Sequence, residues 1–257
     1  MTSIDITQGV ARLTLDNPPV NALSIELLDS VEHALHRLAA RNDWSVLVLA
    51  SNTRVFSGGG DLQIMAEWMR QPDASDLMSA YASRVQRVCR LIEELPQITI
   101  ALCEHSALGG GLELALSCDL RIASTLAKFG LPEVRLGLLP AGGGTQRLTR
   151  LCGISVAMRL ISGAEVLEAA VARQLGIVQW VFEPKRFSED ADRVIERYGA
   201  QPRYAQQASK ACIRMAGEPQ VGFQREIEAL AHLSLLPETL DLVEGFLAGA
   251  REVEKDS

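Results

Sequence analysis

One stretch of the sequence decides the fold: residues 107–115, which read ALGGGLELA. The apolar run Ile98–Leu102 precedes it and is typical of a strand that is buried on both faces of a sheet. The three glycines then open a short apolar helix. Helix N-termini leave backbone N–H groups unpaired, and glycine lets a ligand approach them closely. This turn is therefore either an oxyanion-binding corner or a tight packing turn.

A second glycine turn has the same form. The apolar run Val46–Ala50 leads to Gly58-Gly59-Gly60-Asp61, where Asp61 is expected to cap a helix that begins at Leu62. Strand, glycine turn and helix thus recur at a spacing of roughly 50 residues, which predicts parallel strands joined by right-handed crossovers. Because parallel strands end on the same side of a sheet, the two turns together can supply the N–H donors of one oxyanion hole.

The rest of the chain predicts an α/β core over residues 1–186 and a helical region over residues 187–257. Within the core, the sequence predicts a hairpin at its start and two further helices, over residues 4–16, 24–40 and 75–95. Strands vanish after about residue 184, and helices are expected over residues 187–198, 203–215 and 221–235, and after Pro237. So short a helical region should pack on the core or on a neighbouring subunit.

Composition excludes several classes of protein. The 257 residues are 47% hydrophobic and 22% charged, which is typical of a globular protein and not of a disordered one. A net charge of −7 and scattered basic residues argue against a nucleic-acid partner. No apolar run approaches the ~20 residues of a membrane span, and the first residues do not resemble a secretory signal. Five cysteines without a CxxC motif favour buried thiols in the cytoplasm.

Familiar catalytic and metal motifs are missing from the sequence. The four histidines have no metal-ligand spacing with one another or with cysteine or aspartate, so no metal site is expected. The sequence also lacks a GxSxG nucleophile elbow, a P-loop lysine and a GxGxxG dinucleotide fingerprint.

Two glutamates are the candidates for acid–base chemistry. Glu113 lies one turn into an otherwise apolar helix, where a carboxylate is costly unless it is paired or functional. It is either catalytic or a helix residue that is partly exposed or paired with Arg121 or Arg147. Glu133 follows 20 residues later at an expected helix start, where it is either catalytic or a first-turn glutamate favoured by the helix dipole. Two carboxylates that face one water can divide the acid and base roles.

With these residues identified, the chain resembles the enoyl-CoA hydratase/isomerase family, also called the crotonase superfamily. The resemblance covers residues 10–180 and extends more loosely to residue 250. It rests on motifs whose order and spacing agree: residues 17–23 (NPPVNAL), 55–62 (VFSGGGDL), 107–115 with Cys118-Asp119, 129–133 (FGLPE), and 136–148 with its run of three glycines.

The resemblance implies a crotonase-like spiral of ββα turns that binds an acyl-coenzyme A thioester, followed by a C-terminal helical trimerisation region. By motif position, the backbone N–H groups of Gly60 and Gly110 would form the oxyanion hole. Coenzyme A, as part of the substrate, would contact the segment that ends at Gln63, largely through main chain, and no prosthetic group is implied. The implied binding residues are Arg54, Phe56, Gly58, Gly60, Asp61, Leu62, Gln63 and Gly110. Relatives of this kind are trimers or dimers of trimers.

The two glutamates indicate which reaction of the family to expect. Both carboxylate positions of a hydratase are filled, whereas isomerases of the family commonly keep one. The resemblance therefore implies an enoyl-CoA hydratase, in which Glu113 is the base for water attacking C3 and Glu133 delivers a proton to C2. An enoyl-CoA isomerase, an acyl-CoA hydrolase and a non-catalytic acyl-CoA-binding subunit remain as alternatives. Acyl length, and a pathway in fatty-acid or aromatic degradation, stay open.

Four features depart from the family pattern or extend it. His105 stands where relatives have glycine, and it is either a bulky wall residue or a polar group of the site. Gln63 replaces a residue that is often basic, and Arg251 is the one basic residue near a tail position that often holds a Lys-Arg pair. The segment 64–80 would line the acyl pocket or pack into the core through its large side chains, Met65, Trp68, Met69 and Met78.

Overall fold

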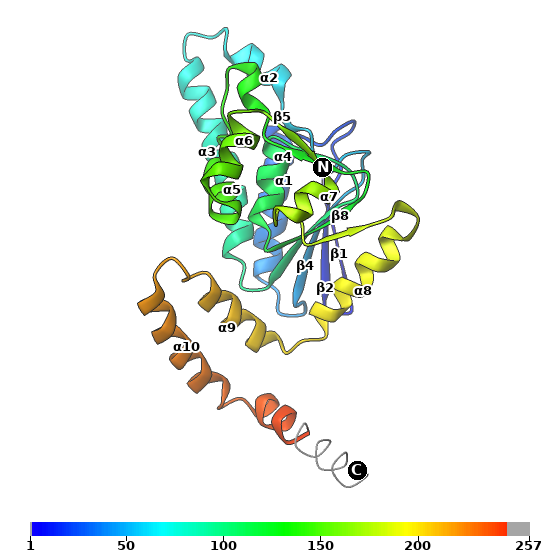
Figure 1. Cartoon of the computed structure of the whole chain (residues 1–257), viewed down its shortest axis with the longest axis vertical. Coiled ribbons are helices and arrows are strands. Elements are labelled where there is room, and N and C mark those ends of the chain that lie inside the picture. The colour runs from blue at the N-terminus through cyan, green and yellow to red at the C-terminus, as the bar shows by residue number, and fades with distance from the viewer. Residues whose placement is uncertain (1, 246–257) are drawn as a thin grey trace. The chain divides into compact units, whose positions relative to one another are not determined.

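A computed structural model of the protein describes residues 2–245 (Figure 1). The chain divides into two compact units, one that ends at Ala200 and one that begins at Gln201. The sequence-based boundary after residue 186 lies one helix earlier. Helix α8 (Phe187–Gly199) belongs to the first unit because its apolar side chains pack on the sheet of that unit.

The first unit is built on a six-stranded sheet with the order β1-β2-β4-β6-β8-β11. Its strands are β1 (Thr2–Thr7), β2 (Val10–Leu15), β4 (Val46–Ser51), β6 (Ile98–Cys103), β8 (Leu120–Ser124) and β11 (Trp180–Phe182). Strands β1 and β2 form the expected antiparallel hairpin, and every other neighbouring pair is parallel. The repeated strand, glycine turn and helix therefore predicted the direction of the strands correctly.

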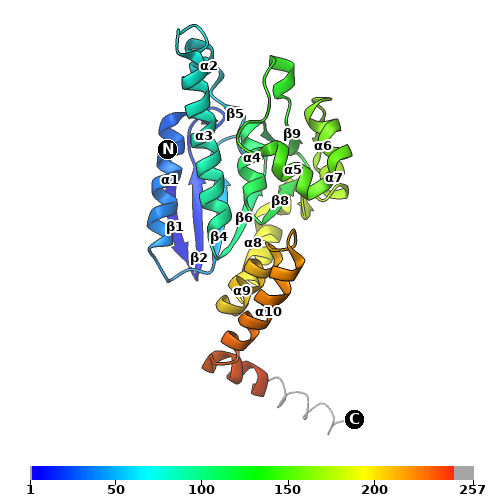
Figure 2. The ribbon, with the colours of Figure 1, turned by 90° about the vertical axis from the view of Figure 1, so that its left-hand side faces the viewer.

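Alternating side chains of the central strands fill two separate cores. In β4, Leu47 and Leu49 belong to one core, whereas Val46 and Val48 belong to the other. Helices α1 (Ile25–Ala39), α3 (Ala74–Glu94) and α4 (Gly110–Ser117) contribute to the first core and lie side by side in Figure 2, and α8 covers the opposite face. A strand that is buried on both faces must be apolar at every position, which explains the unbroken apolar runs in the sequence.

Two small sheets hold the glycine turns in place. Strands β3 (Ala22–Leu23) and β5 (Gly59–Gly60) form a parallel pair. Strands β7 (Ala107–Leu108), β9 (Lys128–Gly130) and β10 (Val166–Glu168) form a three-stranded sheet in the order β10-β9-β7. A bridge between Ser57 and Ala107 connects the segments that lead into the two turns. These short strands were not predicted, because two or three residues carry too little periodicity to be recognised.

The remaining elements of the first unit connect these sheets. They are α2 (Leu62–Trp68), η1 (Glu133–Leu136), α5 (Gly144–Cys152), α6 (Ile154–Ile161), α7 (Ala169–Gln174) and η2 (Pro184–Arg186). The predicted caps are confirmed: Ser24 caps α1, and the Asp61 carboxylate accepts the backbone N–H groups of Gln63 and Ile64 in α2. Glu133 begins a single 3-10 turn, not a longer helix, and this turn ends at the left-handed Gly137.

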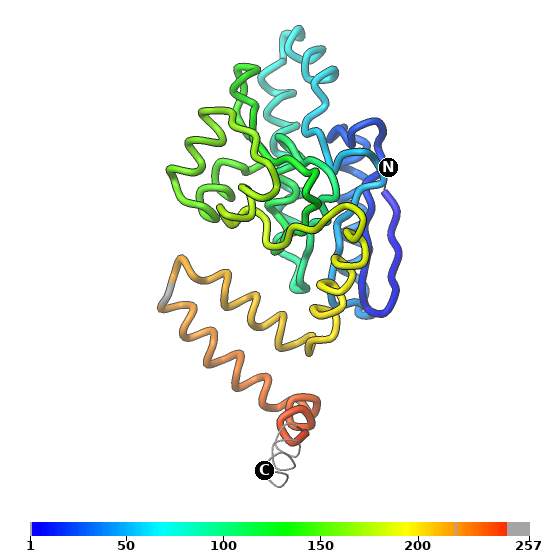
Figure 3. The backbone as a smooth tube through the Cα atoms, turned by 45° about the vertical axis from the view of Figure 1, so that its right-hand side comes forward, coloured from blue at the N-terminus to red at the C-terminus, as the bar shows by residue number. Residues whose placement is uncertain are grey.

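The second unit is helical throughout its described part. Helices α9 (Arg203–Ile213) and α10 (Pro219–Leu233) form an antiparallel pair, which Figure 3 shows as two adjacent coils, and residues 237–245 are helical again. This agrees with the helices expected in the C-terminal region. Arg251, considered above as a tail cation, lies outside the described residues. Within residues 2–245, no helix is both long enough and apolar enough to cross a bilayer.

The contact between the two glycine turns generates a prediction about stability. A Cβ on Gly111 would overlap the Ser57 carbonyl and would lie 2.7 Å from the Ser57 Cβ. We expect Gly111→Ala to lower the free energy of unfolding by about 3 kcal/mol or more, because backbone must move to relieve this overlap. Denaturant titration measures the change. Gly217→Ala is the matched control, since no atom lies within 4 Å of its added Cβ, and equal stabilities of the two variants would contradict the account.

Candidate active site

A cavity of about 440 Å³ brings the two glycine turns and the two glutamates together. It opens between α3, α4 and the segment that contains η1. The side chains around it are mostly apolar, and its lining is Leu23, Gly60, Leu62, Met65, Met78, Ser79, Tyr81, Ala82, Val85, Gly110, Glu113, Glu133, Leu136, Gly137, Leu138, Leu139, Ala141 and Gly142. Gly60, Gly110, Glu113 and Glu133, all expected at the site, therefore line one space.

The two glycine turns approach each other at backbone distance. A Cβ on Gly59 would lie 3.0 Å from the Gly110 nitrogen, and a Cβ on Gly110 would lie 3.6 Å from the Gly60 nitrogen. Gly59 also has a φ of +98°, in the region that favours glycine. As the first residue of α4, Gly110 has an N–H without an acceptor inside the helix. The arrangement suits two backbone donors that serve one oxygen atom.

Buried hydrogen bonds hold the glycine turn at residues 58–60 in place. The Ser57 hydroxyl donates to the Asn21 carbonyl (2.7 Å) and accepts the Gly59 N–H (3.1 Å). The Asn21 side-chain amide donates to the Phe56 carbonyl (3.0 Å). Because Asn21 and Ser57 are both fully buried, these bonds are shielded from water and hold the turn firmly. The NPPVNAL and VFSGGGDL motifs thus meet in one hydrogen-bonded unit.

Glu113 is a buried carboxylate that is held by backbone donors. It is 3% exposed, and its Oε1 accepts the N–H of Gly144 at 2.7 Å. Burial raises the pKa of Glu113, while the amides of the 142–144 glycine run and the charge of Arg147 act in the opposite direction. These donors favour the charged form. Neither predicted ion pair forms, because Arg121 donates to backbone carbonyls and Arg147 pairs with Glu93.

Arg147 supports the loop that holds Glu113. Its guanidinium donates to the Gly142 carbonyl at 2.8 Å and forms an ion pair with Glu93 at 2.6 Å. The third glycine run, which the sequence analysis used only as a motif of the family resemblance, therefore supplies a backbone donor for Glu113. Its pattern alone could not assign this role, since the partner lies 31 residues away in the chain.

The surroundings of the Glu133 carboxyl group differ from those of Glu113. Its Oε2 is buried without a hydrogen-bond partner among the described atoms, and its Oε1 would lie 3.1 Å from a Cβ on Gly109. Burial, followed by the nearby charge of Glu113, raises the pKa of Glu133 to about 7. Glu133 can therefore exchange a proton near neutral pH, whereas backbone donors offset part of the effect of burial on the pKa of Glu113. A pair of carboxyl groups in such contrasting environments is suited to divided base and acid roles.

Only part of the expected coenzyme A segment lines the cavity. Leu62, together with Gly60 and Gly110, does so. Phe56 is buried in the core and its N–H donates to the Ser106 carbonyl, so its side chain has a packing role. Three other residues of this segment, Arg54, Gly58 and Gln63, are exposed, and Asp61 is the cap of α2.

The large side chains of the 64–80 segment divide between cavity and surface. Met65 and Met78 line the cavity, while Met69 is exposed. Trp68 packs on the Tyr81 ring, with 5.7 Å between the ring centroids. Tyr81 itself lines the cavity, although the sequence predicted only that it lies in the helix over residues 75–95. Its hydroxyl was the sequence signal that could have indicated a further role, because the other buried residues of this helix are apolar.

His105 lies away from the two glutamates. It lines a separate, more polar cavity of about 340 Å³ on the side of the sheet that α8 covers, together with Arg12 and Asp192. Of the two interpretations left open for His105, neither a wall under the oxyanion hole nor a polar group of the glutamate cavity matches this position. Among residues 2–245, no cluster of three or more His, Cys, Asp or Glu side chains could hold a metal ion.

Comparison with known proteins agrees with this geometry. The family model described as enoyl-CoA hydratase/isomerase matches residues 5–248. A probable enoyl-CoA hydratase of Bacillus subtilis is 39% identical over 176 residues, which cover 68% of this chain and 67% of that protein. The peroxisomal fatty acid beta-oxidation multifunctional protein AIM1 of Arabidopsis thaliana is 38% identical over 68% of this chain. The match spans only 24% of AIM1, so the chain corresponds to about a quarter of that relative.

Solved structures give the same result for the fold. The crystal structure of an enoyl-CoA hydratase from Bacillus anthracis superimposes with a TM-score of 0.89 at 29% identity and covers 96% of both chains. The expected crotonase-like fold is thereby confirmed. On its sequence motifs, its fold and its match to the family model, this chain belongs to the enoyl-CoA hydratase/isomerase family.

Proposed function

We propose that the protein is an enoyl-CoA hydratase, which adds water to a trans-2-enoyl-CoA to give the 3-hydroxyacyl-CoA. The observation that carries this proposal is the cavity in which Glu113 and Glu133 meet the backbone of Gly60 and Gly110. The substrate would be a coenzyme A thioester bound along the segment from Arg54 to Gln63. The reaction consists of proton transfers and addition of water, so it calls for no prosthetic group.

In this proposal the two glycine amides stabilise the enolate. Attack on C3 moves negative charge onto the thioester oxygen, and the N–H groups of Gly60 and Gly110 would donate to that oxygen. The charge is largest after attack, so these bonds stabilise the transition state more than the bound substrate, which is the condition for catalysis. Removal of one such donor typically costs about 100- to 1000-fold in kcat.

The glutamates would perform the proton transfers. Glu113, whose carboxylate accepts the Gly144 N–H, takes a proton from water as the oxygen bonds to C3. Glu133, whose raised pKa keeps a proton available near neutral pH, delivers it to C2. Isomerisation or thioester hydrolysis would use the same oxyanion hole. Two carboxyl groups with contrasting environments support hydration over these alternatives.

The direct test is the absorbance of the conjugated enoyl thioester in crotonyl-CoA. We expect the band to disappear when enzyme is added, and 3-hydroxybutyryl-CoA to form without free coenzyme A. Double-bond migration in a 3-enoyl-CoA, or thiol release, would indicate the isomerase or the hydrolase instead. Absence of hydration across a panel of chain lengths would refute the proposal.

Substitution of the two glutamates separates catalysis from binding. We expect Glu113→Gln and Glu133→Gln each to lower kcat by about 100-fold or more, because each removes one proton-transfer group. Binding of butyryl-CoA, measured by calorimetry, should stay within a few fold of the wild type. Glu196→Gln, at an exposed carboxylate of α8, is the control. Full activity of either active-site variant would contradict the role assigned to that glutamate, whereas butyryl-CoA binding without any turnover in the wild type would favour the non-catalytic binding subunit.

The pH dependence tests the division of roles. Hydration needs Glu133 protonated, so kcat/KM should fall as pH rises through about 7, the pKa of this carboxyl group. Dehydration of the 3-hydroxyacyl-CoA needs the same single proton on the pair, placed on Glu113, and the overall reaction neither takes up nor releases a proton. Its kcat/KM should therefore fall through the same pH. Initial rates in both directions measure this, and a kcat/KM that stays constant or rises through pH 7 would contradict the assignment.

The lining of the cavity indicates an uncharged acyl group. No Lys, Arg or His belongs to the described lining, and Met65, Met78, Val85 and Leu139 supply apolar surface. An acyl chain with a terminal carboxylate would lose its hydration here without gaining a partner, which is unfavourable. We expect trans-2-hexenoyl-CoA to have a kcat/KM at least about tenfold above that of its ω-carboxylate analogue. Equal values would contradict this part of the proposal.

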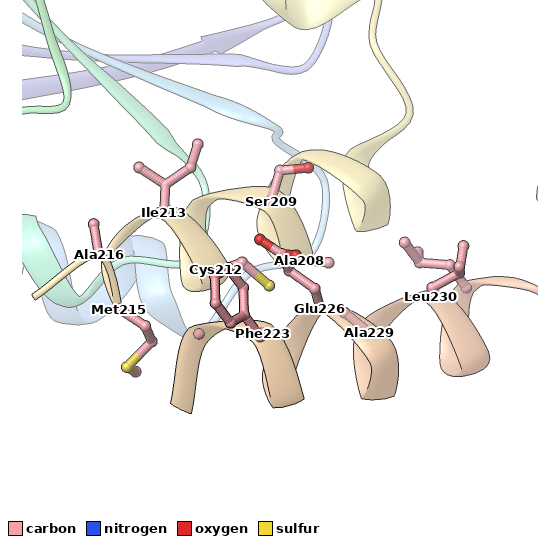
Figure 4. Close-up of a pocket in the computed structure, with 12 residues that line it drawn as sticks. Ala208, Ser209, Cys212, Ile213, Met215, Ala216, Phe223, Glu226, Ala229 and Leu230 are labelled. Carbon is pink, nitrogen blue, oxygen red and sulfur yellow. The ribbon is translucent and has the colours of Figure 1, made fainter. Parts of the chain in front are cut away.

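We further propose a homotrimer or a dimer of trimers in the cytoplasm. Its helical unit exposes apolar side chains, among them Ile213, Phe223 and Leu230, around a hollow of about 640 Å³ between α9 and α10 (Figure 4). Such apolar surface favours burial against another subunit. Light scattering tests this state, and a monomer would contradict it.

Buried free thiols at Cys89, Cys103 and Cys118 suit a reducing compartment, which supports the proposed location in the cytoplasm. By analogy with AIM1, we place the reaction in fatty-acid degradation.

A further inference from the structure

We infer that Tyr81 is a positioning residue of the oxyanion hole, which holds the Gly60 amide in place through the carbonyl of Leu23. The inference rests on the proposed function, because it assigns a role to the support of the proposed donor. Tyr81 would not donate to the substrate. It would fix the short strand pair that carries one of the two backbone donors.

The Tyr81 hydroxyl donates a hydrogen bond to a buried backbone carbonyl. Tyr81 lies on α3, is 8% exposed, and donates to the Leu23 carbonyl at 2.8 Å. Its ring is held by the packing of Trp68 at a centroid distance of 5.7 Å. A phenylalanine would fill the same apolar stripe of α3, so the hydroxyl is not required for packing. The Leu23 carbonyl lies 58 residues away in the chain, in the strand that pairs with Gly60.

Leu23 is the residue that touches both halves of the proposed oxyanion hole. It pairs with Gly60 in the parallel β3–β5 ladder. Its Cδ1 would lie 2.9 Å from a Cβ on Gly110, so its side chain packs directly against the second glycine turn. Leu23 is 1% exposed and has no freedom to move into solvent. A bond that fixes Leu23 therefore fixes the spacing between the two turns.

The ladder at Gly60 is too short to be rigid by itself. Strands β3 and β5 contain two residues each, and both residues of β5 are glycines, which lose more conformational freedom on ordering than any other residue. The phenol adds an anchor from a 21-residue helix that is packed on the core. The Tyr81 oxygen would lie 3.3 Å from a Cβ on Gly60, so it also rests against the α-carbon of the donor residue.

The hydroxyl stays a donor over the working pH range. Burial raises the pKa of Tyr81 to about 12, while a hydrogen bond with the backbone of Asp61 acts in the opposite direction. Asp61 follows Gly60 directly, so the phenol oxygen contacts backbone at Leu23 in β3 and at the residue just after β5.

The test is Tyr81→Phe, which keeps the ring and removes only the hydroxyl. The first readout is the infrared carbonyl band of bound butyryl-CoA labelled with ¹³C at the thioester carbon. This saturated thioester cannot be hydrated, so the band reports donation to the carbonyl independently of the reaction. The band should move back toward its position in free butyryl-CoA. In the same variant, kcat should fall roughly tenfold while KM changes little, because a misplaced donor weakens transition-state stabilisation more than binding.

Controls separate this role from a general structural one. Tyr204→Phe removes an exposed hydroxyl on α9 and should leave the band, kcat and KM unchanged. Thermal unfolding checks that Tyr81→Phe is folded at the assay temperature. A wild-type band at the free position would refute the oxyanion hole, and with it both the proposed function and the role of Tyr81. A shifted wild-type band that Tyr81→Phe leaves unchanged, with unchanged kcat, would overturn the role of Tyr81 alone.

Discussion

The structure depends on the close approach of two glycine turns. A Cβ on Gly59 would lie 2.9 Å from the Leu108 carbonyl, and one on Gly111 would overlap Ser57, so side chains at these positions would push the turns apart. The parallel strands β4 and β6 bring both turns to one end of the sheet, and the small β3–β5 pair and the Ser57–Ala107 bridge fix their spacing. Two backbone N–H groups can then face one oxygen, which is the arrangement that an oxyanion hole requires.

Two glutamates add carboxyl groups beside these turns. Glu113 is surrounded by backbone donors of the 142–144 loop, which Arg147 holds in turn; burial raises the pKa of Glu113, and these donors act in the opposite direction. Glu133 has a buried oxygen without a partner among the described atoms and a pKa raised to about 7. Both line one mostly apolar cavity, yet the backbone around each acts differently on its carboxyl group. The proposed division of base and acid roles depends on this difference.

Much of the fold could be read from the sequence because its signals are local. The apolar runs of β4 and β6 and the caps Ser24 and Asp61 each lie within a few residues of the element they predict. The short strands that hold the glycine turns, and the binding of Glu113 by Gly144, depend on contacts between distant segments and were not foreseen. Tyr81 was predicted only as part of a helix, since nothing in a helical pattern reveals the acceptor of a hydroxyl. Likewise, His105 was considered for the site, but the fold directs it into a different cavity.

The most direct test of the central claim is a crystal structure of the protein with bound butyryl-CoA. The account predicts that the thioester oxygen lies about 2.7–3.1 Å from the backbone nitrogens of both Gly60 and Gly110. It also predicts that C2 and C3 face Glu133 and Glu113. A thioester oxygen that contacts only one of these nitrogens, or an acyl chain outside the cavity that the two glutamates line, would contradict it.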